Sequence, residues 1–357
     1  MPKRMSLPTL LLLALLPAFV PATTGAAPSD SIGVLVMAHG GEPEWNAAVE
    51  KTAEALRAKW PTEVAFGMAD PATLQSGVNA LEAKGVRRIV VARLFLSDGS
   101  FLHQTEYLLG LRPDAPEKFL LHSHGGAHAA GGGAMAGAGQ DAHAGHGMPM
   151  AHGAHAGHDG HPEADKAQAP AAPSPITHTA SLAITRGGLD EYAGTGEILA
   201  ERARALSKDP RTEVVVLLAH GAGDEAENDA ILSRLSGYAG AIRTAAGFAD
   251  VRGFTLREDW PASRAPSERA IRDYVAAHAR SGQRVLVVPF RLFGFGPYRD
   301  VLKGLEYRSD GTGLLPHAAV AEWLASRVRA TLDQQGWAKA ADAGEVIGGA
   351  SAARSER

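Results

Sequence analysis

The residues VLVMAHG at positions 34–40 return as VVLLAHG at positions 215–221. In both copies a run of large apolar residues, long enough for one buried strand, ends at Ala-His-Gly. In the first copy a glycine turn and apolar residues at helical spacing follow, which is typical of a strand that leads into a helix. The shared ending predicts an internal duplication, with a histidine at the end of each half's first strand.

The segments after these two stretches repeat one order. The first half has strand-like runs at 32–38, 63–68 and 86–96, and helical patterns at 45–56 and 70–81. The second half has strand-like runs at 214–219, 250–256 and 284–293, and helical patterns through 235, at 267–279 and at 317–332. Strands that alternate with helices predict parallel sheets covered on both faces. We therefore expect an α/β fold of two tandem lobes, each a small parallel sheet with helices on both faces.

The N-terminus has the composition of a secretory signal. Lys3 and Arg4 precede an apolar run at 10–20, and small residues follow up to Ala26 and Ala27. This pattern predicts a cleavable signal peptide at 1–26 and a periplasmic or secreted protein that has no membrane contact after cleavage. An uncleaved membrane anchor is the alternative.

A stretch rich in alanine, glycine, histidine and proline interrupts the first half. It spans 122–175 and has almost no large apolar residue, so we expect it to be disordered. The expected domains are an N-terminal lobe at 31–208 that contains this insertion, a C-terminal lobe at 212–335 and a flexible tail at 336–357. A helix at 195–206 closes the first lobe in this interpretation, and the helix at 317–332 closes the second.

Composition excludes some classes of function. The 357 residues carry a net charge of -4 with basic and acidic residues interspersed, so the basic surface of a nucleic-acid-binding protein is missing. There is no cysteine, which excludes disulfides and thiolate metal sites. Any metal ion must therefore be held by nitrogen and oxygen ligands.

Two histidines of the first lobe are expected at one edge of its sheet. Ligands of parallel α/β sheets bind beyond the carboxyl ends of the strands. His39 ends the first strand and His103 closely follows the strand that ends near 96, and the acids Glu42, Asp70 and Glu106 lie nearby in sequence. A neutral imidazole is both a metal ligand and a base, so this pair suits an exchange of protons for a metal ion. The alternative is that each histidine only caps a loop or packs locally.

The second lobe keeps one histidine of this pair. Sliding the closing strands over one another sets Asp300 opposite His103 and Lys303 opposite Glu106. His220 is then the one candidate metal ligand in register, with Asp300 or His317 as its expected partner. We therefore expect the main site in the first lobe and a degenerate copy in the second.

The insertion is a candidate store for metal ions. It holds nine of the fifteen histidines, several of them in repeated H-x-x-H spacing, on a background of small residues. Such a tract can surround a nickel, cobalt, zinc or copper ion with several imidazoles, and Met148 and Met150 add soft ligands. A solvated linker with incidental histidines is the alternative. The predicted metal-binding histidines of the repeat are His143, His146, His152, His155, His158 and His161.

The motifs resemble the class II tetrapyrrole chelatases, the CbiX-type sirohydrochlorin cobalto- and ferrochelatases. The resemblance rests on 34–40, on the apolar run at 90–99 followed by a histidine, and on GLLPH at 313–317, and it covers most of the chain outside the signal, insertion and tail. It implies that His39 and His103 are catalytic residues that accept pyrrole protons and hand over or bind the metal, with Glu106 as a proton relay.

The resemblance implies a metal chelatase of the lyase class, which the predicted signal peptide makes an exported one. Its substrates are a divalent metal ion, cobalt first and then iron or nickel, and a tetrapyrrole of the sirohydrochlorin type, and it needs no organic cofactor. The second hypothesis is a non-catalytic periplasmic protein that binds or carries metal ions or metallo-tetrapyrroles.

Overall fold

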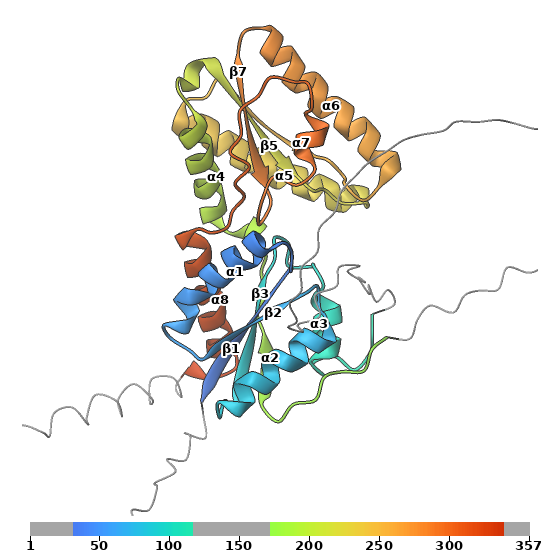
Figure 1. The fold of residues 1–357 in the computed structure, drawn as a ribbon, viewed down its shortest axis with the longest axis vertical. Coiled ribbons are helices and arrows are strands. Elements are labelled where there is room, and N and C mark those ends of the chain that lie inside the picture. Colours follow the sequence, from blue (N-terminus) through green and yellow to red (C-terminus); the bar gives the residue numbers. More distant parts are fainter. Residues whose placement is uncertain (1–30, 117–171, 339–357) are drawn as a thin grey trace, which may run out of the picture.

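The computed structural model describes residues 31–116 and 172–338. The predicted signal peptide, most of the His-rich insertion and most of the predicted tail lie outside these residues. The described chain forms two α/β lobes, one above the other in Figure 1. None of its helices is long and apolar enough to cross a membrane.

The first lobe is built on a four-stranded parallel sheet of order β2-β1-β3-β4. Every residue of the central strand is buried, because the sheet has helices on both faces. The strands are β1 (Ile32–Ala38), β2 (Thr62–Phe66), β3 (Arg88–Leu94) and β4 (Ser181–Ile184). The helices that follow the first three strands are α1 (Pro43–Arg57), α2 (Pro71–Ala83) and α3 (Leu102–Leu108).

The second lobe repeats this order around a three-stranded parallel sheet, β6-β5-β7. A single parallel bridge between Leu286 and Arg308 stands where the first lobe has its fourth strand. The strands are β5 (Glu213–Ala219), β6 (Asp250–Thr255) and β7 (Arg284–Phe290). The helices are α5 (Glu225–Ala246), α6 (Pro261–Arg280) and α7 (Tyr298–Val301).

Two further helices close the halves, α4 (Ala193–Leu206) and α8 (Ala318–Gln334), and short 3-10 turns η1 (Leu189–Glu191) and η2 (Pro210–Thr212) flank α4. Each helix packs mainly on the lobe to which it does not belong in sequence. α4 contacts α5 and β7 of the second lobe, whereas α8 contacts α1 and β3 of the first (Figure 1). The domain boundary predicted from sequence at 208–212 instead assigns α4 to the first lobe and α8 to the second.

The short connection after α4 explains this exchange. Only residues 207–212 separate α4 from β5, so α4 must lie beside the second sheet. In the second lobe, the amide N–H groups of Leu314 and Leu315 donate to the carbonyls of Arg291 and Leu292, at 2.9 and 2.7 Å. This segment therefore runs along the loop after β7 and leads into α8 on the first lobe.

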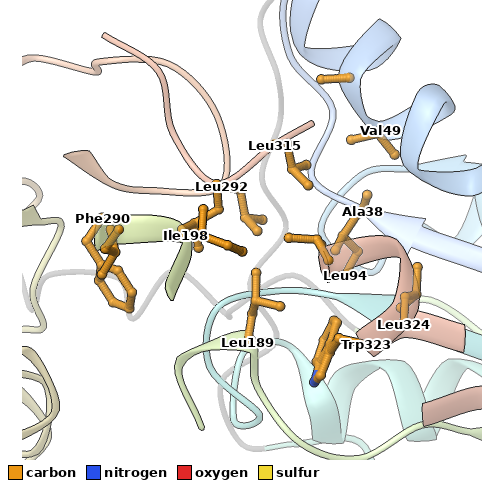
Figure 2. Packing of buried hydrophobic residues seen from close by; sticks show 14 of the residues in the cluster. Ala38, Val49, Leu94, Leu189, Ile198, Phe290, Leu292, Leu315, Trp323 and Leu324 are labelled. Carbon is orange, nitrogen blue, oxygen red and sulfur yellow. The ribbon is translucent and has the colours of Figure 1, made fainter. Parts of the chain in front are cut away.

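Three apolar cores result. One lies between the first sheet and α2 with α3, and another lies between the second sheet and α6 with α7. The third and largest joins the remaining faces of both sheets through α1, α4, α5 and α8 (Figure 2). The predicted α/β architecture with sheets covered on both faces is confirmed, and the exchanged helices make the two lobes share one core.

Candidate active site between the two lobes

The carboxyl ends of the two sheets face one another. Ala38 and Leu94 end the central strands of the first lobe, and they lie in one buried cluster with Leu292 and Leu315 of the second (Figure 2). The histidines that follow β1 and β5 are thus both placed at the junction of the lobes, the position where parallel sheets bind ligands.

His39 stands directly after β1 and is half-buried. Its Nδ1 lies 2.5 Å from the carbonyl oxygen of Gly40, which can only accept a hydrogen bond. In the neutral ring Nδ1 therefore carries the hydrogen and Nε2 carries the lone pair, the form that accepts a proton or binds a metal ion. The imidazole stacks on the indole of Trp45, with ring centroids 4.9 Å apart and planes 25° apart.

His103 lies in the first turn of α3, and 63% of its side chain is exposed. Its Nδ1 is 3.0 Å from Oε2 of Glu106, and the other carboxylate oxygen of Glu106 accepts from Arg186. The hydroxyl of Thr105 lies 3.6 Å from the sulfur of Met37, which places α3 beside the end of β1. His103, Glu106 and Arg186 thus form a linked series at the same edge of the sheet as His39.

A buried arginine fixes the loop that leads into α3. Nη1 of Arg93 lies 3.1 Å from Oδ1 of Asp98, and Nη2 donates to the Asp98 carbonyl at 2.7 Å. Burial lowers the pKa of Arg93, and the nearby Asp98 carboxylate works against that change. Asp98 also accepts from the amide of Gly187 at 2.7 Å, so the same carboxylate ties this loop to the segment that crosses toward α4.

The other acids predicted near His39 have different positions. Asp70 caps α2, since its Oδ1 accepts from the amide of Thr73 at 2.8 Å. Glu42 occupies the N-cap position of α1 but its side chain makes no capping hydrogen bond. Glu106 is therefore the predicted acid that the structure pairs with a histidine of the first lobe.

His220 has other partners than the sequence predicts. Its Nδ1 lies 2.9 Å from the carbonyl oxygen of Gly221, and its Nε2 lies 3.1 Å from Oδ2 of Asp259 and 3.9 Å from Oε2 of Glu258. Both acids follow β6. His317, an expected partner, instead bonds Glu201 at 2.9 Å and caps α8 by accepting from the amide of Ala319 at 3.1 Å.

Strand register explains why Asp300 was the wrong counterpart of His103. Ala38 pairs with Leu94 in the first sheet, and Ala219 pairs with Phe290 in the second. This correspondence sets Arg299 opposite His103, one position away from the sequence-based alignment.

A charged network lies behind His220. Nη1 of Arg291 bonds Oε1 of Glu258 at 2.5 Å, and its guanidinium lies over the ring of Tyr298 at 5.7 Å. Burial alone would lower the pKa of Arg291, but Tyr298 and Glu258 raise it overall, and burial strongly raises the pKa of Tyr298. The equivalent position in the first lobe is the apolar Phe95, so the two halves have diverged behind their histidines.

Within residues 31–116 and 172–338, no group of three or more His, Asp or Glu side chains is arranged to hold a metal ion. The predicted metal-binding repeat lies outside the described residues; it comprises His143, His146, His152, His155, His158 and His161.

Comparisons with known proteins bear on the first lobe and on the two-lobed fold. The CbiX family model matches residues 33–128. SirB from Bacillus subtilis with Fe3+ superposes with a TM-score of 0.53 at 12% identity, over 86% of this chain and 98% of that one. The sirohydrochlorin chelatase SirB from Bacillus subtilis subspecies spizizenii in complex with cobalt has a TM-score of 0.49 at 12% identity, over 85% and 96%. No curated protein matches the chain.

A third solved structure, a multi-domain protein from Deinococcus radiodurans with structural similarity to chelatases, has a TM-score of 0.45 at 17% identity, over 84% of this chain and 54% of that one. The CbiX match falls on the lobe that carries His39 and His103, and the likeness to the first SirB structure extends the fold through both lobes. The comparisons thus relate residues 33–128 to CbiX and the fold of both lobes to the first SirB structure.

Proposed function

We propose that this protein inserts a divalent metal ion into a tetrapyrrole of the sirohydrochlorin type. The observation that carries the proposal is the position of His39: it lies in the lobe that matches CbiX, at the carboxyl end of β1 and at the junction of the two lobes. The neutral imidazole with its lone pair on Nε2 is the form that this reaction requires.

Metal insertion exchanges two pyrrole N–H protons for one metal ion. His39 accepts the first proton or binds the incoming ion, and His103 takes part in the second transfer. Because Nδ1 of His103 is held by Glu106, a proton taken up at Nε2 leaves a cation next to a carboxylate. Arg186 in turn holds the Glu106 carboxylate in place.

The finer parts of the proposal rest on the sequence. We propose cobalt as the first metal, then iron or nickel, and export to the periplasm or beyond after cleavage of residues 1–26. The histidines of the insertion would concentrate the ion beside the first lobe, since the insertion lies between α3 and β4 of that lobe. No nucleic acid is involved, in keeping with the net charge of -4.

A carrier without turnover is the second candidate, because nine of the fifteen histidines lie in the insertion. Such a protein would bind metal ions or metallo-tetrapyrroles in the same place but would not accelerate insertion.

The test follows cobalt insertion into sirohydrochlorin by absorbance. Wild-type protein should raise the rate above the spontaneous one, and His39→Ala should return it toward that level. His278→Ala is the matched control, since His278 lies on α6 and bonds Gln283 at 2.6 Å. If wild type and His39→Ala both run at the spontaneous rate while the protein binds metal and macrocycle, the carrier function replaces this one.

A further inference from the structure

Each of the two strand-end histidines has a tryptophan beside it. The ring of His39 stacks on Trp45 at 4.9 Å, and the ring of His220 meets Trp260 edge to face, at 5.8 Å and 86°. Trp45 also lies 6.0 Å from the ring of Phe293, which follows β7 in the second lobe. Aromatic side chains from both lobes therefore gather where the two sheets face one another.

The two tryptophans reach these equivalent places from different parts of the repeat. Trp45 lies in the first turn of α1, after the first strand of its lobe, whereas Trp260 is the N-cap residue of α6, after the second strand of its lobe. The duplication therefore does not account for the pair, because neither tryptophan occupies the position of the other.

Glycines make room for both indoles. A Cβ atom on Gly223 would lie 2.1 Å from Nε1 of Trp260, and one on Gly41 would lie 3.0 Å from Cε3 of Trp45. Each indole thus packs flat against the backbone of the loop that carries the histidine. This packing fixes the position of the indole relative to the imidazole in both lobes.

Two features are unusual for tryptophans that only fill a core. The indole N–H of Trp45 is buried and has no acceptor among the described residues, although Trp N–H groups in protein interiors ordinarily find one. Trp260 is 37% exposed, one of two large apolar side chains in the described chain with that much exposure. A flat apolar partner from a ligand would cover the exposed ring of Trp260.

We propose that Trp45 and Trp260 bind the flat face of a conjugated macrocycle between the lobes and so present it to His39 and His220. Stacking on indole needs a planar, extended π-system, which a conjugated macrocycle provides. The ligand class rests on the proposed function. The assignment of these two side chains rests on the geometry above.

The experiment measures binding of metal-free uroporphyrin, a stable octacarboxylate macrocycle, to the full chain in the presence of a chelator. Calorimetry gives Kd, and the shift of the Soret band reports stacking. The variants are Trp45→Leu and Trp260→Leu, which keep bulk without a π-face, and Trp45→Phe and Trp260→Phe, which keep a ring. Trp60→Phe is the matched control, because Trp60 packs at the far end of α1.

Trp45→Leu and Trp260→Leu should each weaken binding roughly 3- to 10-fold and reduce the Soret shift, in line with the usual strength of an aromatic pair. The phenylalanine variants should recover most of the loss and Trp60→Phe should bind as wild type. Since Trp260 is exposed, its variant tests the proposal even where Trp45→Leu folds poorly.

Wild-type Kd and Soret shift in both leucine variants would overturn the inference, whatever the rate of metal insertion. Binding that depends on both tryptophans in a wild-type protein that inserts no metal would support the inference and refute the proposed catalysis. The two failures are therefore distinct.

Discussion

Nε2 of His220 lies 3.1 Å from Oδ2 of Asp259, whereas the equivalent His39 stacks on an indole. Nδ1 of His220 also faces an acceptor, the carbonyl of Gly221. Both ring nitrogens of His220 therefore lie within hydrogen-bonding distance of oxygen atoms of the second lobe. The structure thus distinguishes two halves that share one sequence motif, because an acid of its own lobe already engages Nε2 of His220.

The two histidines should therefore contribute unequally to metal insertion. Loss of a general base costs on the order of 100- to 10,000-fold in rate, so His39→Ala should lose at least about 100-fold and His220→Ala less than about tenfold. The measurement is the initial rate of cobalt insertion at saturating macrocycle. A larger loss in His220→Ala than in His39→Ala would move the reacting centre to the second lobe.

The partners of His103 should also matter. Residues that orient a reacting imidazole typically contribute about 10- to 100-fold, so Glu106→Gln should lower kcat in that range with little change in KM. Arg186→Ala should lower kcat less, and Arg186→Lys should restore part of it, since lysine keeps the charge but not the planar fork. Arg211→Ala is the control, because Arg211 forms only an exposed pair with Asp209. Equal kcat in Glu106→Gln and wild type would exclude the relay.

Local sequence patterns predicted most of the fold because they describe what each segment buries. The bounds of β1 match the prediction, since all seven of its residues are buried. The sequence misplaced the end of α5, which runs past 235 to a left-handed Gly247, and the start of α6, which begins at Pro261 and contains Pro266. It missed α3 and α7, whose short length gives no clear period. Nothing in the local sequence predicts the exchange of α4 and α8, because the apolar face of a helix does not specify which sheet it packs on.

The site was predicted in part for the same reason. His39, His103 and Glu106 follow strands or share a helical turn, so sequence spacing brings them to one edge. Asp259 and Arg186 were missed, because each comes from a loop whose direction depends on the lobe contact. The dipeptide Glu258-Asp259 directly after β6 was an available signal, since acids at the carboxyl end of a parallel strand face the ligand crevice.

The His-rich insertion should carry most of the metal capacity. Deletion of residues 122–161 should remove the greater part of the divalent-metal binding seen by calorimetry, because imidazoles on a small-residue chain bind several ions without a fixed cage. The fold of the two lobes should persist, since the deletion ends before the residues that form β4. Replacing the same histidines by asparagine at full length controls for chain length. Undiminished metal binding would remove the storage role.

Asp190 predicts a pH effect on stability. It lies in η1, in the segment that crosses between the lobes, and burial raises its pKa from 3.8 to about 6, although Arg234 at 3.1 Å works against that change. Because the folded state binds this proton more tightly than the unfolded chain, stability falls as pH rises from 3.8 to about 6 and then levels off. The difference corresponds to ~3 kcal/mol at most, taking 1.36 kcal/mol per pH unit.

Asp190→Asn should therefore flatten this part of the pH profile. At pH 7.5 we expect a gain of about 1–2 kcal/mol in urea unfolding, less than the full amount because the pair with Arg234 is lost. Asp209→Asn, an exposed acid, is the control. A variant that is less stable than wild type at pH 7.5, with an unchanged slope between pH 4 and 6, would show that the carboxylate is stabilised by Arg234 instead.

Because α8 packs on the first lobe, a core mutation in α8 should destabilise the first lobe. Leu324 is fully buried in the shared core, and α8 packs mainly on α1 and β3 of the first lobe. Leu324→Ala leaves a cavity and should cost about 2–5 kcal/mol. Glu322→Ala, on the exposed side of the same helix, should stay within about 0.5 kcal/mol of wild type.

Amide hydrogen exchange in Leu324→Ala should rise first in β1 and β3, although Leu324 follows the second lobe in sequence, because α8 covers those strands. If exchange instead rises first in β5 and β7, α8 belongs to the second lobe and the division at 208–212 is the correct one.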